Sequence, residues 1–150
     1  METKEIDVVL VAKHSFTTSL AEVMAGKLDQ AQKLMAEVTR QGYNAHVPHI
    51  WNYIACDGKM DSRFTLEMCI PVDKKGEETD FISFAELPAA KCVSYMHKGA
   101  YSEMGAVYEK LFGDLGKNGQ IPTGNCREVY HHWEMENLEN NITEIQIEVQ

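Results

Sequence analysis

The chain lacks the sequence features that would place it in a membrane or on nucleic acid. It has no apolar run near the roughly 20 residues that span a bilayer, and its N-terminus, METKEID, is not a secretory signal. The 14 Lys and Arg residues are outnumbered by 23 Asp and Glu, and the net charge of −9 provides no basic face for DNA or RNA. We therefore expect a cytoplasmic protein with no direct nucleic-acid partner and no membrane contact.

The sequence also lacks a recognisable metal, redox or phosphate-binding motif. No two of its 4 cysteines form a C-x-x-C pair, and such scattered residues usually pack as small hydrophobes in cytoplasmic proteins. His131 and His132 are adjacent and would point to opposite faces of a strand, while His46 and His49 lack the spacing of metal ligands. No Gly-Lys-Ser/Thr follows the glycines. We expect no bound metal and no cofactor.

The apolar residues that are present follow clear strand and helix periods. Ser19 and Glu22 form a capping box, and an apolar spacing near 3.6 predicts one helix from there to Gly42. Ser102 caps a second predicted helix, which ends at Gly119. Short β-rich or alternating runs predict the strands. These strands are residues 6–12, 46–56, 63–72, 81–84, 91–97, 127–134 and 142–149.

The order strand–helix–strand–strand occurs twice along the chain. A shift of 77 residues lays Tyr53 on Tyr130 and Glu67 on Glu144, which indicates an internal duplication. Because each helix has a single apolar stripe, two helices cover one face of a sheet and leave the other open. We predict an α+β fold: a duplicated strand–helix–strand–strand unit, with an antiparallel sheet, two helices on one face and a ligand cleft on the other. It forms one domain, residues 1–150, with pseudo-repeats at about 6–72 and 85–149.

The open face is predicted to combine aromatic rings with carboxylates. Aromatic walls and a carboxylate suit a flat, apolar or cationic ligand. In the alternative interpretation, the rings pack on one another and the glutamates simply face water. Glu67 and Glu144 occupy equivalent positions, from which both could approach the centre. From the alternation, this face carries His49, Trp51, Tyr53, Glu67, Cys69, Glu128, Tyr130, His132, Glu144 and Gln146.

Four motifs in the second half are similar to those of a known family. In chain order they are Leu87-Pro88-Ala89-Ala90-Lys91-Cys92-Val93, His97-Lys98-Gly99-Ala100-Tyr101, Arg127-Glu128-Val129-Tyr130 and Thr143-Glu144-Ile145-Gln146-Ile147. Together they resemble the GyrI-like small-molecule-binding family, which includes effector-binding domains of AraC- and MerR-type regulators and the stand-alone DNA gyrase inhibitory protein. The resemblance covers residues 85–149 well and the whole chain weakly. The sequence departs from the family at Glu148, where proline is usual, which weakens any transfer of subfamily.

The resemblance implies a ligand cleft between the two repeats. In multidrug-sensing members, a cleft glutamate and surrounding aromatic rings receive lipophilic cations, and the matching strand here carries Glu144, with Tyr130 as its aromatic neighbour. Some stand-alone relatives hydrolyse cyclopropane-bearing DNA-alkylating compounds; in such an enzyme Glu67 and Glu144 would activate water. The full predicted ligand-binding set is Glu144, Tyr130, Glu67, Trp51, Tyr53 and Glu128.

Three functions stay open at the level of the sequence. The leading hypothesis is a stand-alone, non-catalytic protein that senses or sequesters a small lipophilic molecule, including cations. We expect the effector-like domain to use all 150 residues, which would leave no room for a helix-turn-helix among them. The alternatives are a hydrolase of strained electrophilic natural products and an interaction protein of the gyrase-inhibitor type. The latter would use the acidic region from residue 134 onward, with five Glu and no Lys or Arg, to engage a basic protein surface.

Overall fold

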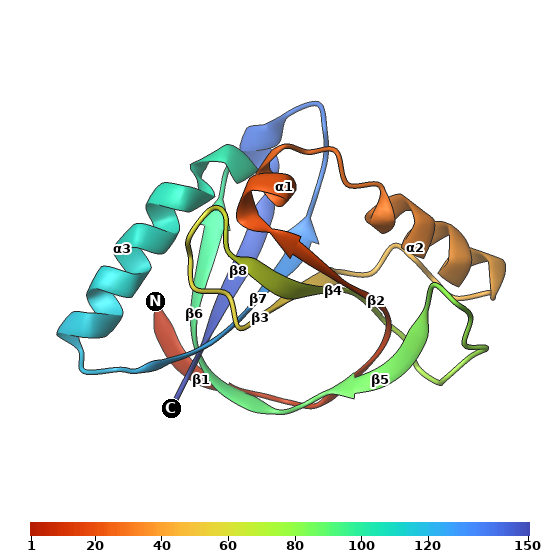
Figure 1. Cartoon of the computed structure of the whole chain (residues 1–150), viewed down its shortest axis with the longest axis horizontal. Helices are drawn as coiled ribbons and strands as arrows, with labels where there is room; N and C mark the ends of the chain where they lie inside the picture. Colours follow the sequence, from red (N-terminus) through yellow and green to blue (C-terminus); the bar gives the residue numbers. More distant parts are fainter.

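The computed structural model describes residues 1–150 and contains one eight-stranded antiparallel sheet (Figure 1). The strands lie side by side in the order β1-β6-β8-β7-β3-β4-β2-β5. They are β1 (Glu2–Ile6), β2 (Val9–Ser19), β3 (His49–Ile54), β4 (Arg63–Pro71), β5 (Ser83–Leu87), β6 (Ala90–Lys98), β7 (Pro122–His132) and β8 (Ile142–Val149). The α+β class and the antiparallel sheet predicted from the sequence are confirmed.

The helices lie over one side of the curled sheet. They are α1 (Leu20–Met24), α2 (Gln30–Arg40) and α3 (Met104–Lys117), with short 3-10 turns at η1 (Tyr101–Glu103) and η2 (Leu138–Asn140). In Figure 1, α3 stands on one flank and α2 on the other, with α1 between them, while the edge strands β1 and β5 curl round on the side away from the helices. No helix combines the length and apolar character that crossing a membrane requires.

The strand order repeats about the centre of the sheet. Outward from the centre, β3, β4 and β2 follow one another on one side, and β7, β8 and β6 follow in the equivalent order on the other. At the centre β3 pairs with β7, so that His49 is opposite Tyr130 and Trp51 is opposite Glu128. Because paired residues point to the same face, side chains from both halves meet along this seam.

Each long helix packs its apolar stripe on one half of the sheet. Leu34 and Val38 of α2 belong to one buried cluster with Leu66 of β4. Leu115 of α3 belongs to a second buried cluster with Ile145 of β8. The two clusters are separate. This leaves room for a site at the centre of the sheet.

The single helix predicted before Gly42 is interrupted. A turn separates α1 from α2, and in it Gly26 has φ +68°, in the left-handed region that favours glycine. Leu28, within this turn, still packs against the first apolar cluster, so the period of the pattern continues across the break. Ser19 caps α1 as predicted, because its hydroxyl accepts a hydrogen bond from the backbone N–H of Glu22 at 3.3 Å.

The residues assigned to one open face are in fact divided between the two faces of the sheet. Trp51 pairs with the core residue Met68, so Trp51 and its partner Glu128 face the helices. Glu67 and Glu144 lie on the opposite face. Alternation identifies the two faces of each strand but not the register between strands, and an offset of one residue moves a side chain to the other face. The prediction of a single shared face was therefore wrong.

Candidate functional site

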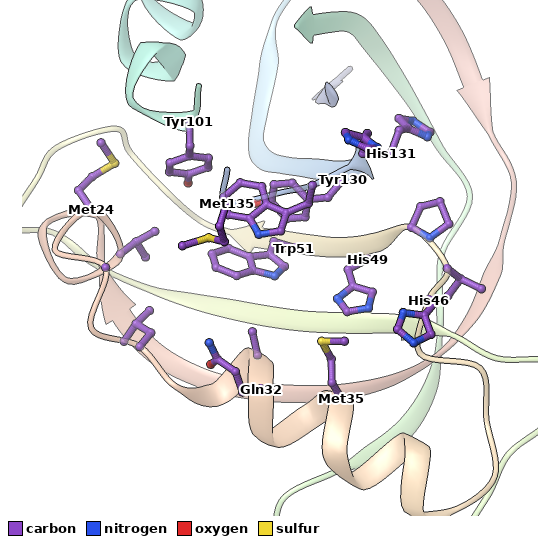
Figure 2. A pocket seen from close by; sticks show the side chains of 18 residues that line it. Met24, Gln32, Met35, His46, His49, Trp51, Tyr101, Tyr130, His131 and Met135 are labelled. Atoms are coloured by element: carbon purple, nitrogen blue, oxygen red, sulfur yellow. The ribbon is translucent and has the colours of Figure 1, made fainter. Parts of the chain in front are cut away.

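A cavity of about 670 Å³ opens at the centre of the sheet, on the side of the helices. β3 and β7 form its floor, α1, α2 and the turn between them form a wall, and Tyr101 of η1 lies at one end (Figure 2). Of its 18 lining residues 11 are hydrophobic, and none is Lys, Arg, Asp or Glu. The cleft was predicted on the face away from the helices, and the register between β3 and β4 corrects this to the helix-covered face.

Aromatic rings form the floor of the cavity. Trp51 of β3 and Tyr130 of β7 meet edge to face, with ring centroids 5.4 Å apart and planes at 85°. Trp133, just after β7, continues this surface, with its ring centroid 6.1 Å from that of Tyr130. Met24 of α1 and Met35 of α2 face the rings from the wall. Aromatic faces and flexible thioethers together suit flat, apolar ligands of variable shape.

Glu128 lies beneath this floor and is only 2% exposed. Its carboxylate accepts hydrogen bonds from the hydroxyls of Tyr130 at 2.5 Å, Tyr108 at 2.8 Å and Tyr53 at 3.3 Å. The hydroxyl of Tyr101 lies 3.1 Å from that of Tyr53. Tyrosines from β3, η1, α3 and β7 thus enclose one carboxylate, and two of them, Tyr101 and Tyr130, also line the cavity.

The carboxylate of Glu128 has hydrogen-bond donors but no cationic partner. It takes part in none of the ion pairs of the structure. Burial raises the pKa of Glu128 above its usual range, and the tyrosine hydroxyls offset this only in part. Burial also raises the pKa values of Tyr53, Tyr108 and Tyr130, which keeps their hydroxyls protonated as donors. A buried carboxylate without a counter-ion is costly on its own and attracts a cation.

Glu144, by contrast, is already neutralised on the other face of the sheet. Its carboxylate pairs with Lys4 Nζ at 2.7 Å and accepts hydrogen bonds from Ser94 Oγ at 2.7 Å and Gln146 Nε2 at 3.0 Å. His131 Nε2 lies 3.0 Å from its second oxygen. Burial alone would raise the pKa of Glu144, but these partners outweigh it and lower the pKa to about 2.

Glu67 occupies the equivalent position in the first half and is neutralised in the same way. Lys13 Nζ lies 2.5 Å from its carboxylate, and Asn52 Nδ2 and Ser15 Oγ donate to it at 2.9 and 3.2 Å. Burial raises the pKa of Glu67, but these partners reverse the effect and lower it. Neither Glu67 nor Glu144 lines the cavity.

The six predicted ligand-binding residues therefore occupy three kinds of position. Trp51 and Tyr130 line the cavity, and Tyr53 and Glu128 lie directly beneath its floor. The remaining two, Glu67 and Glu144, pair with lysines on the face of the sheet away from the helices. The structure brings Glu128 to the centre, where the sequence analysis placed Glu144.

Tyr101 and Tyr108 belong to the candidate site through the hydrogen bonds around Glu128, and the sequence analysis assigned neither of them to it. Tyr108 falls within the second helix predicted between Ser102 and Gly119, and Tyr101 is the last residue of a family motif. A tyrosine at a core-facing position of a helix needs a hydrogen-bond partner for its hydroxyl, and for Tyr108 this requirement could have indicated a buried polar group nearby. The methionines of α1 and α2 had no such signal, since a methionine stripe on a helix most often belongs to the core.

A curled antiparallel sheet with an aromatic cavity above a buried carboxylate defines an α+β small-molecule-binding domain. The chain belongs to the GyrI-like family: the model of the GyrI-like small molecule binding domain matches residues 8–150. This confirms the resemblance noted in the second-half motifs. No curated protein matches the chain.

Solved structures share the fold at low sequence identity. The C-terminal domain of EcmrR is 24% identical, with a TM-score of 0.77 over 99% of this chain and 96% of that one. In the cryo-EM structure of an EcmrR–DNA complex the identity is 23% and the TM-score 0.80, and 99% of this chain spans 56% of the EcmrR chain. SAV2435, solved bound to tetraphenylphosphonium, is 13% identical, with a TM-score of 0.70 over 99% and 93% of the two chains. A hydrolase from Listeria innocua is 13% identical, with a TM-score of 0.62 over 99% and 90%.

Proposed function

We propose that this domain binds lipophilic aromatic cations in the central cavity, as the ligand-receiving part of a sensing or sequestering system. One observation carries the proposal: Glu128 is a buried carboxylate with three tyrosine donors and no cationic partner in the protein. A cationic ligand supplies the missing charge. The aromatic floor supplies contact area and cation–π attraction.

The geometry suggests how a cation would reach the carboxylate. Tyr101 and Tyr130 are the residues that both line the cavity and belong to the tyrosine enclosure of Glu128. Rotation of either ring away from Glu128 would open a path to its charge. The hydroxyls of Tyr53 and Tyr108 would remain in place as donors, so rotation of Tyr130 would exchange one neutral donor to the carboxylate for a positive charge.

The relatives support the proposal by analogy. SAV2435 has been solved with tetraphenylphosphonium, a permanent lipophilic cation, and the C-terminal domain of EcmrR belongs to a protein solved on DNA. A role in sensing is proposed for the present chain by analogy with EcmrR, which has been solved on DNA. A hydrolase or an acidic interaction protein stays an alternative prediction, and the hydrolase candidates Glu67 and Glu144 do not line the cavity.

Calorimetric titration with tetraphenylphosphonium tests the proposal, with triphenylphosphine oxide as a neutral ligand of similar aromatic character. The wild-type protein should prefer the cation, and Glu128→Gln should weaken cation binding by about tenfold or more while affecting the neutral compound little. Glu67→Gln is the matched control, because it removes a similarly buried carboxylate from the far face. Equal weakening by both substitutions, or none by Glu128→Gln, would contradict the role of Glu128.

A further inference from the structure

The cavity opens to solvent beside the segment that joins β7 to β8. Trp133 and Met135 of this segment both line the cavity, yet Trp133 is 52% exposed and Met135 is 77% exposed. Met24 of α1 is also an exposed lining residue, on the wall (Figure 2). Lining residues with so much surface in water mark the mouth of the cavity. We call Met24, Trp133 and Met135 the outer rim.

The outer rim gathers apolar surface at one place. Single exposed hydrophobic residues are normal on a protein, but a group of them beside a cavity indicates a binding surface. Trp133 is also continuous with the floor, through its contact with Tyr130. Both tryptophans of the chain, Trp51 and Trp133, therefore line the same cavity, one on its floor and one at its mouth.

Asn141 holds the backbone between the two rim residues of this segment. Asn141 is only 1% exposed. Its Oδ1 accepts a hydrogen bond from the backbone N–H of Glu134 at 2.7 Å, and its Nδ2 donates to the carbonyl oxygen of Glu134 at 3.2 Å. The last pair of the β7–β8 ladder is His132 with Ile142. Beyond that pair, the side-chain amide of Asn141 takes the place of a neighbouring strand, because it offers a donor and an acceptor side by side.

Fixing the backbone of Glu134 fixes the side chains on either side of it. Trp133 and Met135 are two residues apart, and both line the cavity, whereas Glu134 between them does not. This alternation is typical of an extended segment, in which every second side chain points to the same side. The two hydrogen bonds to Glu134 therefore keep an indole and a thioether directed at the cavity together.

Asn141 also connects the outer rim to the enclosure of Glu128. Its backbone carbonyl oxygen accepts a hydrogen bond from the N–H of Gly99 at 2.9 Å. Gly99 lies two residues before Tyr101, which lines the cavity and whose hydroxyl contacts Tyr53 in that enclosure. One buried asparagine thus ties two separate lining segments to each other.

We propose that Trp133 and Met135 contact the outer part of the bound ligand and set a preference for bulky ligands, and that Asn141 is the positioning residue that holds them. This inference rests on the proposed function and narrows its ligand class to cations that extend from the floor to the outer rim. A cation with several aromatic rings covers both exposed side chains. A cation with one ring leaves this apolar surface in water and gains nothing from it.

Two permanent cations of different size test the contact residues. Tetraphenylphosphonium carries four rings and phenyltrimethylammonium carries one. In calorimetric titrations, Trp133→Ala and Met135→Ala should each weaken tetraphenylphosphonium by about three- to tenfold and phenyltrimethylammonium by less than about twofold. Met96→Ala is the matched control, because Met96 is also an exposed methionine, at 56%, but does not line the cavity. It should change neither affinity.

The role of Asn141 is tested by a double-substitution cycle. Asn141→Leu has a side chain of similar volume but makes neither hydrogen bond to Glu134, so it should weaken tetraphenylphosphonium by about three- to tenfold. Adding Trp133→Ala to this variant should cost little more, because Trp133 is then no longer held in place. A residue that only stabilises the fold would lower the melting temperature and leave the two effects additive. If circular dichroism shows that Asn141→Leu is unfolded, Asn141→Ser, which is smaller and too short for both bonds, replaces it in the cycle.

The outcomes separate this inference from the proposed function. Equal weakening of both cations by Trp133→Ala and Met135→Ala, weakening of neither, or an equal effect of Met96→Ala overturns the contact surface. Additive effects in the cycle overturn the positioning role of Asn141. In all of these cases a loss of cation binding in Glu128→Gln would still support the proposed function. If the wild-type protein binds neither cation, both proposals fail.

Discussion

Trp51 lies directly opposite Glu128 where the two halves of the sheet meet. The shift of 77 residues that aligns Tyr53 with Tyr130 also places Trp51 on Glu128. The two positions that this shift aligns carry unlike groups, an aromatic ring on β3 and a carboxylate on β7. If both of these positions carried glutamate, as positions 67 and 144 do, two like charges would lie opposite each other between β3 and β7. Such an arrangement is unfavourable without counter-ions.

Glu128→Gln should make the ligand-free protein more stable. The folded-state pKa of Glu128 is raised above its ordinary value, so its ionised form is disfavoured by folding. The protonated form of Glu128 therefore contributes its full stabilisation of the folded state below the unfolded-state pKa. This contribution is lost as the pH rises through the folded-state pKa. At pH 7 a neutral amide of the same shape should therefore add roughly 1 kcal/mol, or about 2–4 °C in melting temperature.

Thermal unfolding by circular dichroism, repeated at pH 4 and pH 7, checks this prediction. The difference between the wild-type protein and Glu128→Gln should be smaller at the lower pH, where the glutamate is more protonated. Glu67→Gln should lower stability at pH 7, because Glu67 has a lowered pKa and pairs with Lys13. A less stable Glu128→Gln protein at pH 7 would contradict the argument.

Binding of a permanent cation should weaken as the pH falls. Protonation of Glu128 removes its charge when the pH drops through its raised pKa. Titration with tetraphenylphosphonium at neutral and at mildly acidic pH, in the wild-type protein and in Glu128→Gln, isolates the contribution of this carboxylate. The variant should show a shallower pH dependence, and identical slopes would exclude Glu128 as the titrating group.

The fold could be predicted where apolar alternation is strong. The strand expected at residues 142–149 is observed with the same bounds as β8. β1 (Glu2–Ile6) was missed, because an edge strand with mostly polar, exposed residues has no alternation to detect. The extension of β2 through Ser19 was missed for the same reason, since this stretch includes several polar residues.

The candidate site could be predicted only in its components. Trp51, Tyr130 and Glu128 were recognised as ligand-type residues, but their separation from Glu144 depends on the register between strands. Register is set by pairing across long sequence distances, which a single sequence does not encode in a readable form. The ion pair between Lys4 and Glu144 likewise joins residues from opposite ends of the chain.

Glu144→Gln should reduce stability at neutral pH and have little effect in strong acid. The folded-state pKa of Glu144 is lowered to about 2. The stability from its ionised form is present above the unfolded-state pKa and is lost as the pH falls toward 2. The expected loss at pH 7 is on the order of 2–3 kcal/mol. Urea unfolding at pH 7 and pH 3 measures it, and a constant difference between the two would argue against this linkage. Glu37→Gln, in the exposed pair with Arg40, should change stability much less.

Gly26→Ala should destabilise the protein because it forces alanine into a left-handed backbone. Gly26 has φ +68°, and a methyl group added at its Cα would meet no atom within 4 Å, so the penalty comes from the backbone and not from crowding. The expected loss is about 1 kcal/mol. Gly113→Ala is the matched control, since Gly113 is an open position inside α3, where alanine is the better helix former and should add about 0.5–1 kcal/mol. Chemical unfolding of both variants checks the opposite signs. A neutral Gly26→Ala would mean that the turn between α1 and α2 adapts to the new residue, and that the wall of the cavity is not held by this glycine.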